Sequence, residues 1–509
     1  MRPGGDRPAW RAAVAVALWL AAAGAAAMAH ATGAAPAGRA GARGDARAEQ
    51  LAAKAARLLE RRELEGARVG IDVHSITRGE RLWSHHADRA LVPASNLKLV
   101  TLALALSVLG ADFEFETPLV AGGPLVAGGR LEGDLWIHGG GDPTLQPRFF
   151  ESEDEAAGLQ PFVQALELHG VTRIRGDLVV DARAFDDVRV PEGWPPDQLD
   201  REYAAPVAAL SLNGNCLRVR VSARRGLPPL AELRPAVSGW SLQSDLGAGA
   251  QSDAFQVALA APDRGGVVRV RGSVGSDVGV KSVAVPVADP PLYFGLALRA
   301  ALERAGITLS GVVRRAEGEE APGAGARTLY TRRSPLRPAL LLCGKESDNH
   351  IAEHLLKACA RARFGQGTVE HGARLVQELG REIGADASAV RIVDGSGLSR
   401  LDLLTPAFVT ALLAHAYAAP WRDEFVRCLP ISGVDGTLDQ RMTEPAMRYR
   451  VRAKTGFIAQ VSALSGYALA GEEPDQEVFA FSILVNGFKG ANADMKKLQD
   501  DLCRAVVSP

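Results

Sequence analysis

Alternating apolar and polar residues mark the first ordered part of the chain. Two alternating segments, 67–76 and 80–87, flank a polar turn and predict a β-hairpin. The run that follows, 95–110, is apolar on nearly every side. A helix without a polar face belongs inside a domain, so we expect a buried helix with Ser95 at its N-cap and Gly110 at its end.

The texture of the chain changes between residues 112 and 333. Short runs of valine, leucine and arginine alternate there with glycine, aspartate and proline, which predicts many short strands joined by turns. One helix is expected near the end of this region, at 290–306. Helical periods return after Ser334, and the chain closes with two strand-like runs and a terminal helix. A mixed α/β texture therefore brackets a β-rich region.

The N-terminus has the pattern of an export signal. Three arginines precede an apolar stretch, 12–28, and small residues follow at Ala27 and Ala29. The stretch is short for a membrane span, which needs about 20 residues, so cleavage is favoured over anchorage. We expect a periplasmic protein with a signal peptide at 1–29. Whether an uncleaved signal keeps the protein at the membrane stays open.

These patterns divide the chain into five parts. The signal peptide (1–29) is followed by a disordered linker (30–48) of small and polar residues without periodicity. An α/β domain then comprises 49–118 and 333–509. A β-rich insertion of one or two nested domains, 119–332, interrupts it.

Charge and cysteine content narrow the class of function. Lysine and arginine number 58 against 59 aspartates and glutamates, a net charge of −1. This balance argues against a nucleic-acid partner bound through bulk charge. The five cysteines are widely spaced and form no C-x-x-C pair, which argues against a zinc ribbon or a redox motif. We expect isolated, buried cysteines.

Three short motifs carry residues suited to acyl transfer. They are Ser-Asn-Leu-Lys at 95–98, Ser-Asp-Asn at 347–349 and Lys-Thr-Gly at 454–456. The first alone is weak, because a Ser-x-x-Lys pair arises about twice by chance in a chain of this length. The first two motifs are expected to begin helices and the third to precede a strand. Their order, context and complementary chemistry make the set specific for penicillin-interacting serine enzymes.

The first motif supplies a nucleophile and its base. A serine hydroxyl reacts well only when a nearby base takes its proton. Lys98 shares a helix face with Ser95, and burial beside a second amine, Lys454, lowers the pKa of a lysine. We therefore predict Ser95 as the nucleophile and a neutral Lys98 as the general base. The backbone N–H groups of Ser95 and Phe457 are predicted to form the oxyanion hole.

The other motif residues suit proton transfer and substrate binding. Ser347 can relay the proton towards the leaving nitrogen, and Asn349 can hold the amide of a substrate. Lys454 and Thr455 offer a charge and a hydroxyl to a carboxylate. Gly456 is expected to let the substrate backbone approach closely.

With these motifs the chain resembles the D-alanyl-D-alanine carboxypeptidase/endopeptidase family, the class C low-molecular-mass penicillin-binding proteins. The similarity extends from about residue 50 to the end and includes the long insertion between the first two motifs. Further blocks that carry it are "VPASNLKLVT", "GGGDPTL", "YAAPVAALSLNGN", "ESDNHIAEHLLK", "VDGSGLSRLDLLTP", "LPISGVDGTL" and "AKTGFIAQVSALSGYA".

The resemblance implies a fold, a substrate and an inhibitor class. The fold would be an α/β serine β-lactamase/DD-transpeptidase-like domain, an antiparallel sheet flanked by helices, interrupted by the inserted region. The enzyme would use no cofactor or metal. It would remove terminal D-Ala from peptidoglycan stem peptides or cleave D-Ala–diaminopimelate cross-links, and β-lactams would acylate Ser95.

The resemblance also assigns a side-chain pocket and shows one departure. In the family an arginine and an aspartate line the pocket for diaminopimelate, and the matching positions here are Arg400 and Asp181. A small hydroxyl residue commonly follows the glycine of the third motif, whereas this chain has Phe457. Its ring is expected to narrow the cleft.

Other interpretations compete with the serine mechanism. His350 and His354 in "HIAEH" fit the H-x-x-E-H pattern of zinc proteases, but no compelling third ligand follows them. The segment "GGGDPTL" lacks the spacing of a phosphate loop, so we expect a structural turn. Structural roles are also expected for Ser396, Asp394, Asp402, Trp136 and Trp194, the aspartates as ordinary loop carboxylates and the tryptophans as packing anchors.

Two further functions stay open. One is a β-lactamase-like hydrolase, although we identify no glutamate placed for rapid deacylation. The other is a catalytically silent peptidoglycan-binding protein, although the intact motif residues argue against it. The sequence leaves the oligomeric state and the balance between carboxypeptidase and endopeptidase action undetermined.

Overall fold

The computed structural model describes residues 37–223, 227–249, 258–260, 266–275 and 279–508. The expected signal peptide lies outside these residues. Helix α2 (Ala37–Leu59) begins inside the expected linker, so the prediction of a structureless segment is wrong from residue 37 onward. Alanine has the highest helix propensity of all residues, and its abundance in this segment favours a helix over a coil.

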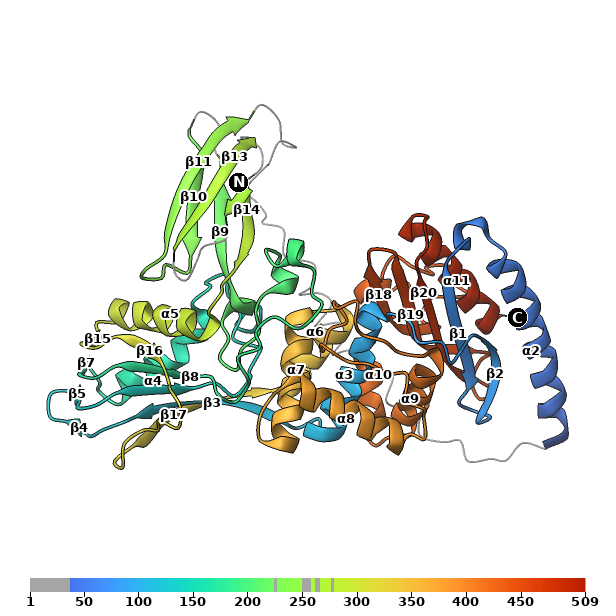
Figure 1. Cartoon of the computed structure of the whole chain (residues 1–509), viewed down its shortest axis with the longest axis horizontal. Coiled ribbons are helices and arrows are strands. Elements are labelled where there is room, and N and C mark those ends of the chain that lie inside the picture. The colour runs from blue at the N-terminus through green and yellow to red at the C-terminus, as the bar shows by residue number, and fades with distance from the viewer. Residues whose placement is uncertain (1–36, 224–226, 250–257, 261–265, 276–278, 509) are drawn as a thin grey trace, which may run out of the picture.

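A five-stranded antiparallel sheet unites the two ends of the chain (Figure 1). In sheet order the strands are β18 (Val451–Ile458), β19 (Val461–Ala470), β20 (Glu477–Asn486), β1 (Arg68–Ser75) and β2 (Glu80–His85). The expected hairpin is confirmed, because β1 pairs with β2. Strand β1 also pairs with β20, the last strand of the chain.

Helices cover both faces of this sheet. The terminal helix α11 (Asn492–Val507) and α2 pack on one face, around buried residues such as Leu51, Ile483 and Leu498. The other face is covered by a helical layer around a second cluster. That layer comprises α3 (Lys98–Leu104), α6 (Leu336–Lys345), α7 (Asn349–Phe364), α8 (Val369–Glu382), α9 (Pro406–Ala418) and α10 (Arg422–Cys428).

The expected buried helix is present, but its start differs from the expectation. Every residue of α3 is buried. Ser95 is not its N-cap: it lies in a 3₁₀ turn, Ala94–Leu97, that leads into α3. The Ser95 hydroxyl faces the Lys98 amine and makes no capping hydrogen bond with the backbone. A π turn follows α3, and Gly110 ends the segment with φ of 83°.

Two neighbouring strands carry the chain into and out of the insertion. Strands β3 (Glu114–Ala121) and β17 (Arg327–Pro335) pair antiparallel, from Glu114 opposite Pro335 to Ala121 opposite Arg327. Because the strands that enter and leave the insertion lie next to each other, the insertion interrupts the α/β domain at a single place and leaves its packing intact. Both strands belong to a second five-stranded sheet with β6 (Leu135–His138), β8 (Leu178–Asp181) and β16 (Val313–Arg315).

Two helices pack against the sheets of the insertion. The expected helix near its end is α5 (Pro290–Arg304). Helix α4 (Gln160–Leu168) was not predicted, because it is short and lies among turn-forming residues. A small sheet completes this part, with strands β4 (Leu125–Val126), β5 (Arg130–Leu131), β7 (Arg173–Ile174) and β15 (Thr308–Leu309).

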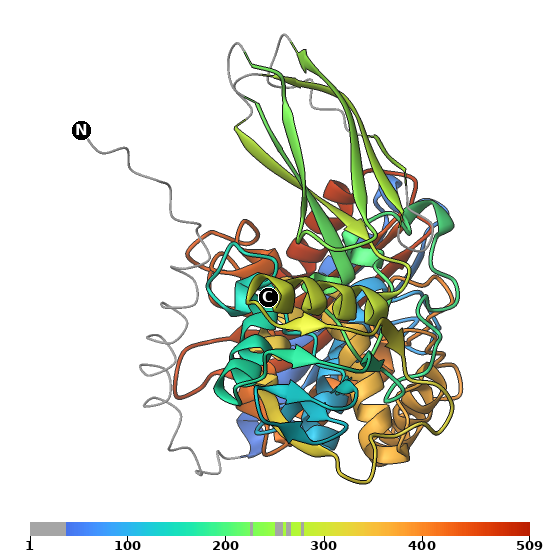
Figure 2. The same cartoon turned by 90° about the vertical axis from the view of Figure 1, so that its left-hand side faces the viewer.

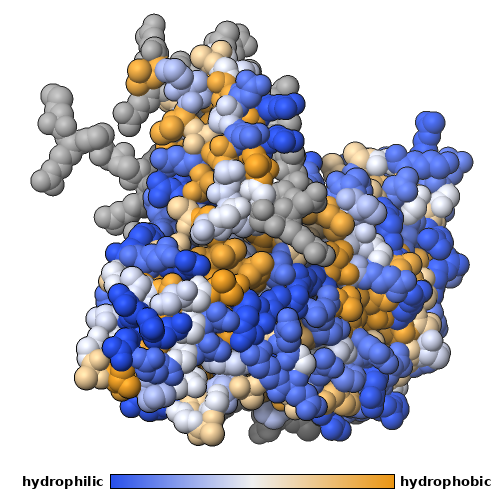
Figure 3. All heavy atoms as spheres, turned by 60° about the vertical axis from the view of Figure 1, so that its left-hand side comes forward, coloured by the Kyte–Doolittle hydropathy of each residue, from blue (hydrophilic) through white to orange (hydrophobic). Residues whose placement is uncertain are grey.

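A second β module projects from the insertion (Figures 1 and 2). Figure 3 shows hydrophobic residues along the projecting strands, whereas much of the remaining face is hydrophilic. Leu230 and Val280 on this module are more than half exposed. Its sheets contain β9 (Cys216–Ser222), β10 (Leu230–Arg234) and β14 (Val280–Pro286), and β11 (Ser241–Gly249), β12 (Ala258–Ala260) and β13 (Val267–Gly275).

The architecture confirms the predicted α/β domain interrupted by a β-rich insertion. All five cysteines are buried and free, as expected. Within the described ranges, no helix has the length and apolar character that a membrane crossing requires.

Candidate active site

The three motifs converge beside α3. Ser95 lies in the turn before the helix, directly after Ala94, which has a left-handed φ of 47°. The Lys98 side chain is fully buried. Its Nζ lies 3.0 Å from Ser95 Oγ, 2.7 Å from Asn349 Oδ1 and 2.7 Å from the backbone oxygen of Ser396.

This arrangement suits a neutral amine. Burial lowers the pKa of Lys98 below its ordinary value of 10.5, although the carboxyl group of Asp394 acts in the opposite direction. A neutral amine has two N–H groups, and Asn349 Oδ1 and the Ser396 carbonyl accept both. The lone pair is then directed at the remaining neighbour, the Ser95 hydroxyl.

The second amine of the site lies under the second motif. Lys454 is fully buried, and its Nζ donates to Ser347 Oγ at 2.8 Å and to the Thr455 carbonyl at 2.9 Å. Burial, followed by repulsion from Lys98, holds the pKa of Lys454 well below 10.5. Ser347 itself has φ of 63°. A left-handed conformation costs a non-glycine residue about 1–2 kcal/mol, so surrounding contacts must hold it.

Helix α7 begins at the second motif, as expected. Asp348 is its N-cap, and its Oδ1 accepts a hydrogen bond from the Ile351 amide at 2.9 Å. Asn349 accepts from Lys98 on one side and donates through Nδ2 to the Tyr203 carbonyl at 2.9 Å on the other. Because Tyr203 belongs to the insertion, the Asn349 amide links the insertion to the amine of Lys98.

The third motif precedes strand β19, as expected, and it also lies within a further strand, β18, that was not predicted. A Cβ at Gly456 would lie 2.8 Å from the Pro93 oxygen and 3.1 Å from the Ser95 nitrogen. The glycine therefore admits the turn of the first motif, whereas the sequence suggested that it admits substrate. Phe457 follows with 55% of its surface exposed, so its ring is not part of the core.

Asn96 stabilises the contact between the turn of the first motif and β18, and it was not identified from the sequence. Its Nδ2 donates to the Lys454 carbonyl at 2.8 Å, and its Oδ1 accepts from Ser465 Oγ at 2.6 Å. The side chain is completely buried. The burial of a polar residue next to Ser95 was not evident from the Ser-x-x-Lys motif, whose second position is not specified. Nearby, the hydroxyls of Thr455 and Thr437 are 2.8 Å apart.

Buried carboxyl groups hold the loop that carries the Ser396 carbonyl. Asp394 accepts from the amides of Ser396, Gly397 and Ser399 at 3.0, 2.6 and 2.8 Å. It also accepts from Trp194 Nε1 of the insertion at 2.9 Å. The expectation of ordinary loop carboxylates is wrong for Asp394 and Asp402, because both are fully buried. Trp194 is buried as expected, but it also donates this hydrogen bond.

Glu353 is a further buried acid that sequence reasoning missed. Its Oε2 accepts from the Gly395 amide at 2.8 Å. Burial and the neighbouring Asp394 raise the pKa of Glu353 to about 8. Glu353 follows Asn349 by four residues, so both side chains lie on one face of α7. This spacing was the only feature of the sequence that could have indicated a place for Glu353 near the site.

The raised pKa of Glu353 predicts a pH-dependent stability. The carboxyl ionises near pH 4.5 in the unfolded chain but only near pH 8 in the folded protein. The stability that it contributes is therefore fully present below pH 4.5 and is lost as the pH rises to 8. Glutamine cannot ionise, so Glu353→Gln should melt about 2–4 °C above wild type at pH 8. Calorimetry at pH 4.5 should show equal melting temperatures.

The matched control is Glu167→Gln, which alters an exposed glutamate on α4. It should leave the pH dependence of melting unchanged. Equal melting of wild type and Glu353→Gln at pH 8 would show that Glu353 is ionised in the folded protein.

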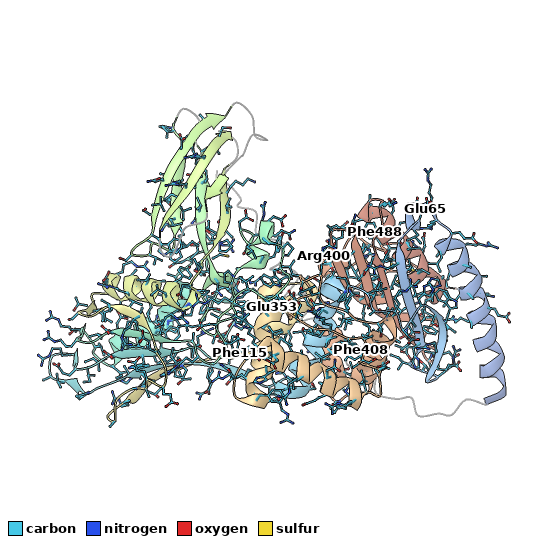
Figure 4. The ribbon with its side chains drawn as sticks, in the orientation of Figure 1. Glu65, Phe115, Glu353, Arg400, Phe408 and Phe488 are labelled. Atoms are coloured by element: carbon cyan, nitrogen blue, oxygen red, sulfur yellow. The ribbon has the colours of Figure 1, made fainter. Side chains whose placement is uncertain are left out.

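The two predicted pocket residues occupy different places. Figure 4 shows Arg400 and Glu353 near the junction of the insertion and the helical layer. An N–H of the exposed Arg400 guanidinium donates to the Ala459 carbonyl, just after β18. Arg400 therefore lies beside the strand of the third motif.

Asp181 is not brought together with the three motifs. Its carboxylate bonds to His138 Nδ1 at 2.9 Å and to Arg183 Nε and Nη2 at 2.8 Å. Burial by itself would raise its pKa, but the hydrogen bonds from Arg183 and His138 lower it below the ordinary range. All these partners belong to the insertion, so the role of Asp181 in a substrate pocket stays a prediction.

The geometry also bears on the zinc interpretation. His354 Nδ1 lies 2.7 Å from the His350 carbonyl, and Nε2 lies 2.8 Å from Ser211 Oγ and 3.0 Å from the Ala208 carbonyl. Both ring nitrogens are engaged in these contacts. Over the part of the chain that the structure describes, no three histidine, cysteine or acidic side chains group as metal ligands would.

Comparison with known proteins agrees with this geometry. Residues 51–506 match a family described as "D-Ala-D-Ala carboxypeptidase 3 (S13) family". A D-alanyl-D-alanine carboxypeptidase of Actinomadura sp. (strain R39) is 34% identical, over 85% of this chain and 80% of the relative. The D-alanyl-D-alanine carboxypeptidase DacB of Haemophilus influenzae is 25% identical, over 85% and 88%.

Solved structures show the same fold. Penicillin-binding protein 4 from Haemophilus influenzae superposes with a TM-score of 0.76 at 23% identity, covering 89% of this chain and 99% of that one. Its complex with a β-lactam gives 0.71 at 22% identity, covering 91% and 99%. The predicted fold class is confirmed.

Proposed function

Because the chain belongs to the D-Ala-D-Ala carboxypeptidase 3 (S13) family, we propose that it forms an acyl-enzyme on Ser95 with peptidoglycan stem peptides. The predicted family and enzyme class, a serine-type D-Ala-D-Ala carboxypeptidase, are confirmed by this membership. The roles of the individual residues are our proposal.

One observation carries the proposal: the three neighbours of Lys98 Nζ. Two of them can only accept hydrogen bonds, and the third is the hydroxyl of Ser95. A buried neutral amine in this setting has one free electron pair and one proton within reach. General-base catalysis requires this arrangement.

Acylation then proceeds in a balanced sequence. Ser95 Oγ attacks the carbonyl carbon of the penultimate D-Ala while its proton passes to Lys98 Nζ. The C–N bond to the terminal D-Ala breaks, and the leaving nitrogen receives the proton held by Lys98 through Ser347, whose hydroxyl is bonded to Lys454. Lys98 is then neutral again and takes a proton from the water that attacks the ester. That proton returns to Ser95 Oγ as the C–O bond breaks and the shortened peptide leaves.

The oxyanion of this reaction needs two backbone donors. The Ser95 amide lies against β18 at Gly456, and Phe457 is the next residue of that strand. We assign both N–H groups to the developing negative charge, which preorganised donors stabilise strongly.

Substrate recognition falls to the neighbours of Ser95. Asn349 would donate to a peptide carbonyl, and Thr455 and Lys454 would bind the terminal carboxylate. Because the free site disfavours a proton on Lys454, an anionic substrate would draw one in. Arg400 and Asp181 remain our candidates for the diaminopimelate side chain, on the basis of the resemblance.

The cellular setting follows from the substrate. Stem peptides lie outside the cytoplasmic membrane, and a signal peptide at 1–29 would deliver the enzyme to the periplasm. β-Lactams would act as inhibitors by acylating Ser95.

The test is a paired assay of the purified protein. Mass spectrometry after treatment with labelled penicillin should find the label on the tryptic peptide that contains Ser95, and pretreatment with unlabelled penicillin should abolish it. A D-Ala-D-Ala pentapeptide should release D-Ala, and muropeptide profiling should show which bonds are cut. Label on another residue, or no D-Ala release, would contradict the proposal.

The same assay separates the alternatives. A β-lactamase would lose its penicilloyl adduct faster than it releases D-Ala. Glu353, the buried glutamate nearest to the base, bonds to the backbone of Gly395, and its hydrogen bond is not with Ser95. A silent binding protein would show neither adduct nor product.

A further inference from the structure

An arginine of the insertion, Arg148, contacts both residues that flank Ser347 in the sequence. Arg148 lies in a 3₁₀ turn, Pro147–Phe149, shortly after the glycine-rich segment of the insertion. Its Nη2 donates to Asp348 Oδ2 at 2.5 Å, and its Nη1 lies 3.6 Å from Glu346 Oε2. One guanidinium therefore contacts the residues before and after Ser347.

Ser347 is the residue that needs such support. Its φ of 63° is left-handed, a conformation that a serine keeps only when its surroundings hold it. The planar guanidinium fixes the direction of two carboxylates at once. By holding Glu346 and Asp348, Arg148 opposes relaxation of the backbone between them.

The same contact fixes the start of α7. Asp348 uses its second oxygen to cap the helix at the Ile351 amide. The next residue, Asn349, accepts a hydrogen bond from Lys98 Nζ. A shift of Asp348 would therefore move both the hydroxyl of Ser347 and the acceptor that orients the base.

Buried contacts fix the segment that precedes Arg148. Asp142 is buried and accepts from the Thr144 amide and hydroxyl at 2.8 and 2.7 Å, and from Ser334 Oγ at 2.5 Å. Just after Arg148, the guanidinium of Arg332 lies over the ring of Phe150, 4.6 Å from its centroid. The glycine-rich segment 139–145 therefore has a structural role next to the turn that carries Arg148.

We propose that Arg148 is a positioning residue for acyl transfer, and that the insertion thereby forms part of the catalytic apparatus. Arg148 acts mainly through the position of Ser347, because its guanidinium binds the residues before and after that serine. This inference rests on the proposed function, because it requires that Ser347 takes part in the reaction.

A purely structural ion pair makes a different prediction. The Arg148 side chain is 33% exposed, and exposed ion pairs contribute little to stability. Such a pair could be removed without a change in reactivity, or with a loss that does not depend on Ser347.

A double-mutant cycle separates the two cases. Second-order rate constants for acylation by labelled penicillin are measured for wild type, Arg148→Ala, Ser347→Ala and the double variant. A displacement of about 1 Å in a catalytic group costs up to about 100-fold, so Arg148→Ala should react about 10–100-fold more slowly. In the Ser347→Ala background the same change should have an effect of less than about 3-fold.

Two more variants keep the test independent of folding. Asp348→Asn retains the N-cap oxygen but loses the charge that Arg148 binds, so it should show a similar loss. Arg148→Lys should recover part of the rate, because a lysine reaches one carboxylate but not both. The control Arg299→Ala removes an ion pair with Glu303 on α5 and should react like wild type.

The outcomes are distinct. Arg148→Ala at the wild-type rate, or an equal loss with and without the Ser347 hydroxyl, would overturn the positioning role. Wild-type protein that forms no penicillin adduct would instead overturn the proposed function.

Discussion

Lys98→Met is expected to reduce the rate constant of acylation by penicillin about 10³-fold. Methionine fills a similar volume in the buried site but has no basic nitrogen. Ser95 Oγ would keep its place in the turn and lose the group that removes its proton. Stopped-flow measurement with a fluorescent penicillin reports this step directly, because it follows adduct formation and not turnover.

The control for this change is Lys54→Met, which alters a lysine on α2 whose Nζ donates to the Ser508 carbonyl. It should acylate at the wild-type rate. Normal acylation by a folded Lys98→Met protein would remove Lys98 from the role of base.

The pH profile of the wild type belongs to the same prediction. Burial lowers the pKa of Lys98, so the midpoint of the acid limb in a plot of acylation rate against pH should lie below the ordinary lysine pKa of 10.5. Acylation should rise with pH through that limb, because the reactive form of Lys98 is the deprotonated one.

Lys454→Met is expected to produce the second-largest loss, about 10²-fold in the acylation rate constant. Ser347 would lose the amine that lies 2.8 Å from its hydroxyl, and the substrate carboxylate would lose its cation. Both losses act on the reaction, because the proton path and the binding site are changed together.

The pH profile of Lys454→Met tests which of the two buried amines loses its proton first. Burial and repulsion from a charged Lys98 hold the pKa of Lys454 well below 10.5. We therefore expect Lys454 to be neutral already when Lys98 loses its proton, so replacing it by the neutral methionine should leave the acid limb of the acylation profile at the wild-type pH. A limb at lower pH in the wild type than in Lys454→Met would show that Lys454 is still charged when Lys98 titrates.

The candidate site joins segments that the insertion separates along the chain. Lys98, our candidate for the base, begins α3, and the acceptors of its amine come from α7 and from the loop held by Asp394. The insertion adds the Tyr203 carbonyl, the Trp194 indole and the Arg148 guanidinium. This arrangement gives the insertion a structural connection to the reaction, whatever its projecting β module binds.

Several residues near the site could not be identified from the sequence, because their partners lie far away along the chain. Arg148 and Asp348 are 200 residues apart, and so are Trp194 and Asp394. Side chains such as these carry no local pattern, because an arginine in a turn or an aspartate in a loop looks like any solvated charge. Asp181 shows the reverse case, since a matching position in the chain did not place its carboxylate beside the motifs.

The sequence by itself determined the hairpin, the buried helix after Ser95, the β-rich insertion and the residues of the three motifs. These features depend on periodicity and on short spacings, which a single segment contains. Only the tertiary structure decided that Gly456 admits the turn of Ser95, that Asp394 and Glu353 are buried, and that Arg148 reaches Asp348, the residue after Ser347. Burial and long-range contact arise from packing between distant segments, so no local pattern specifies them.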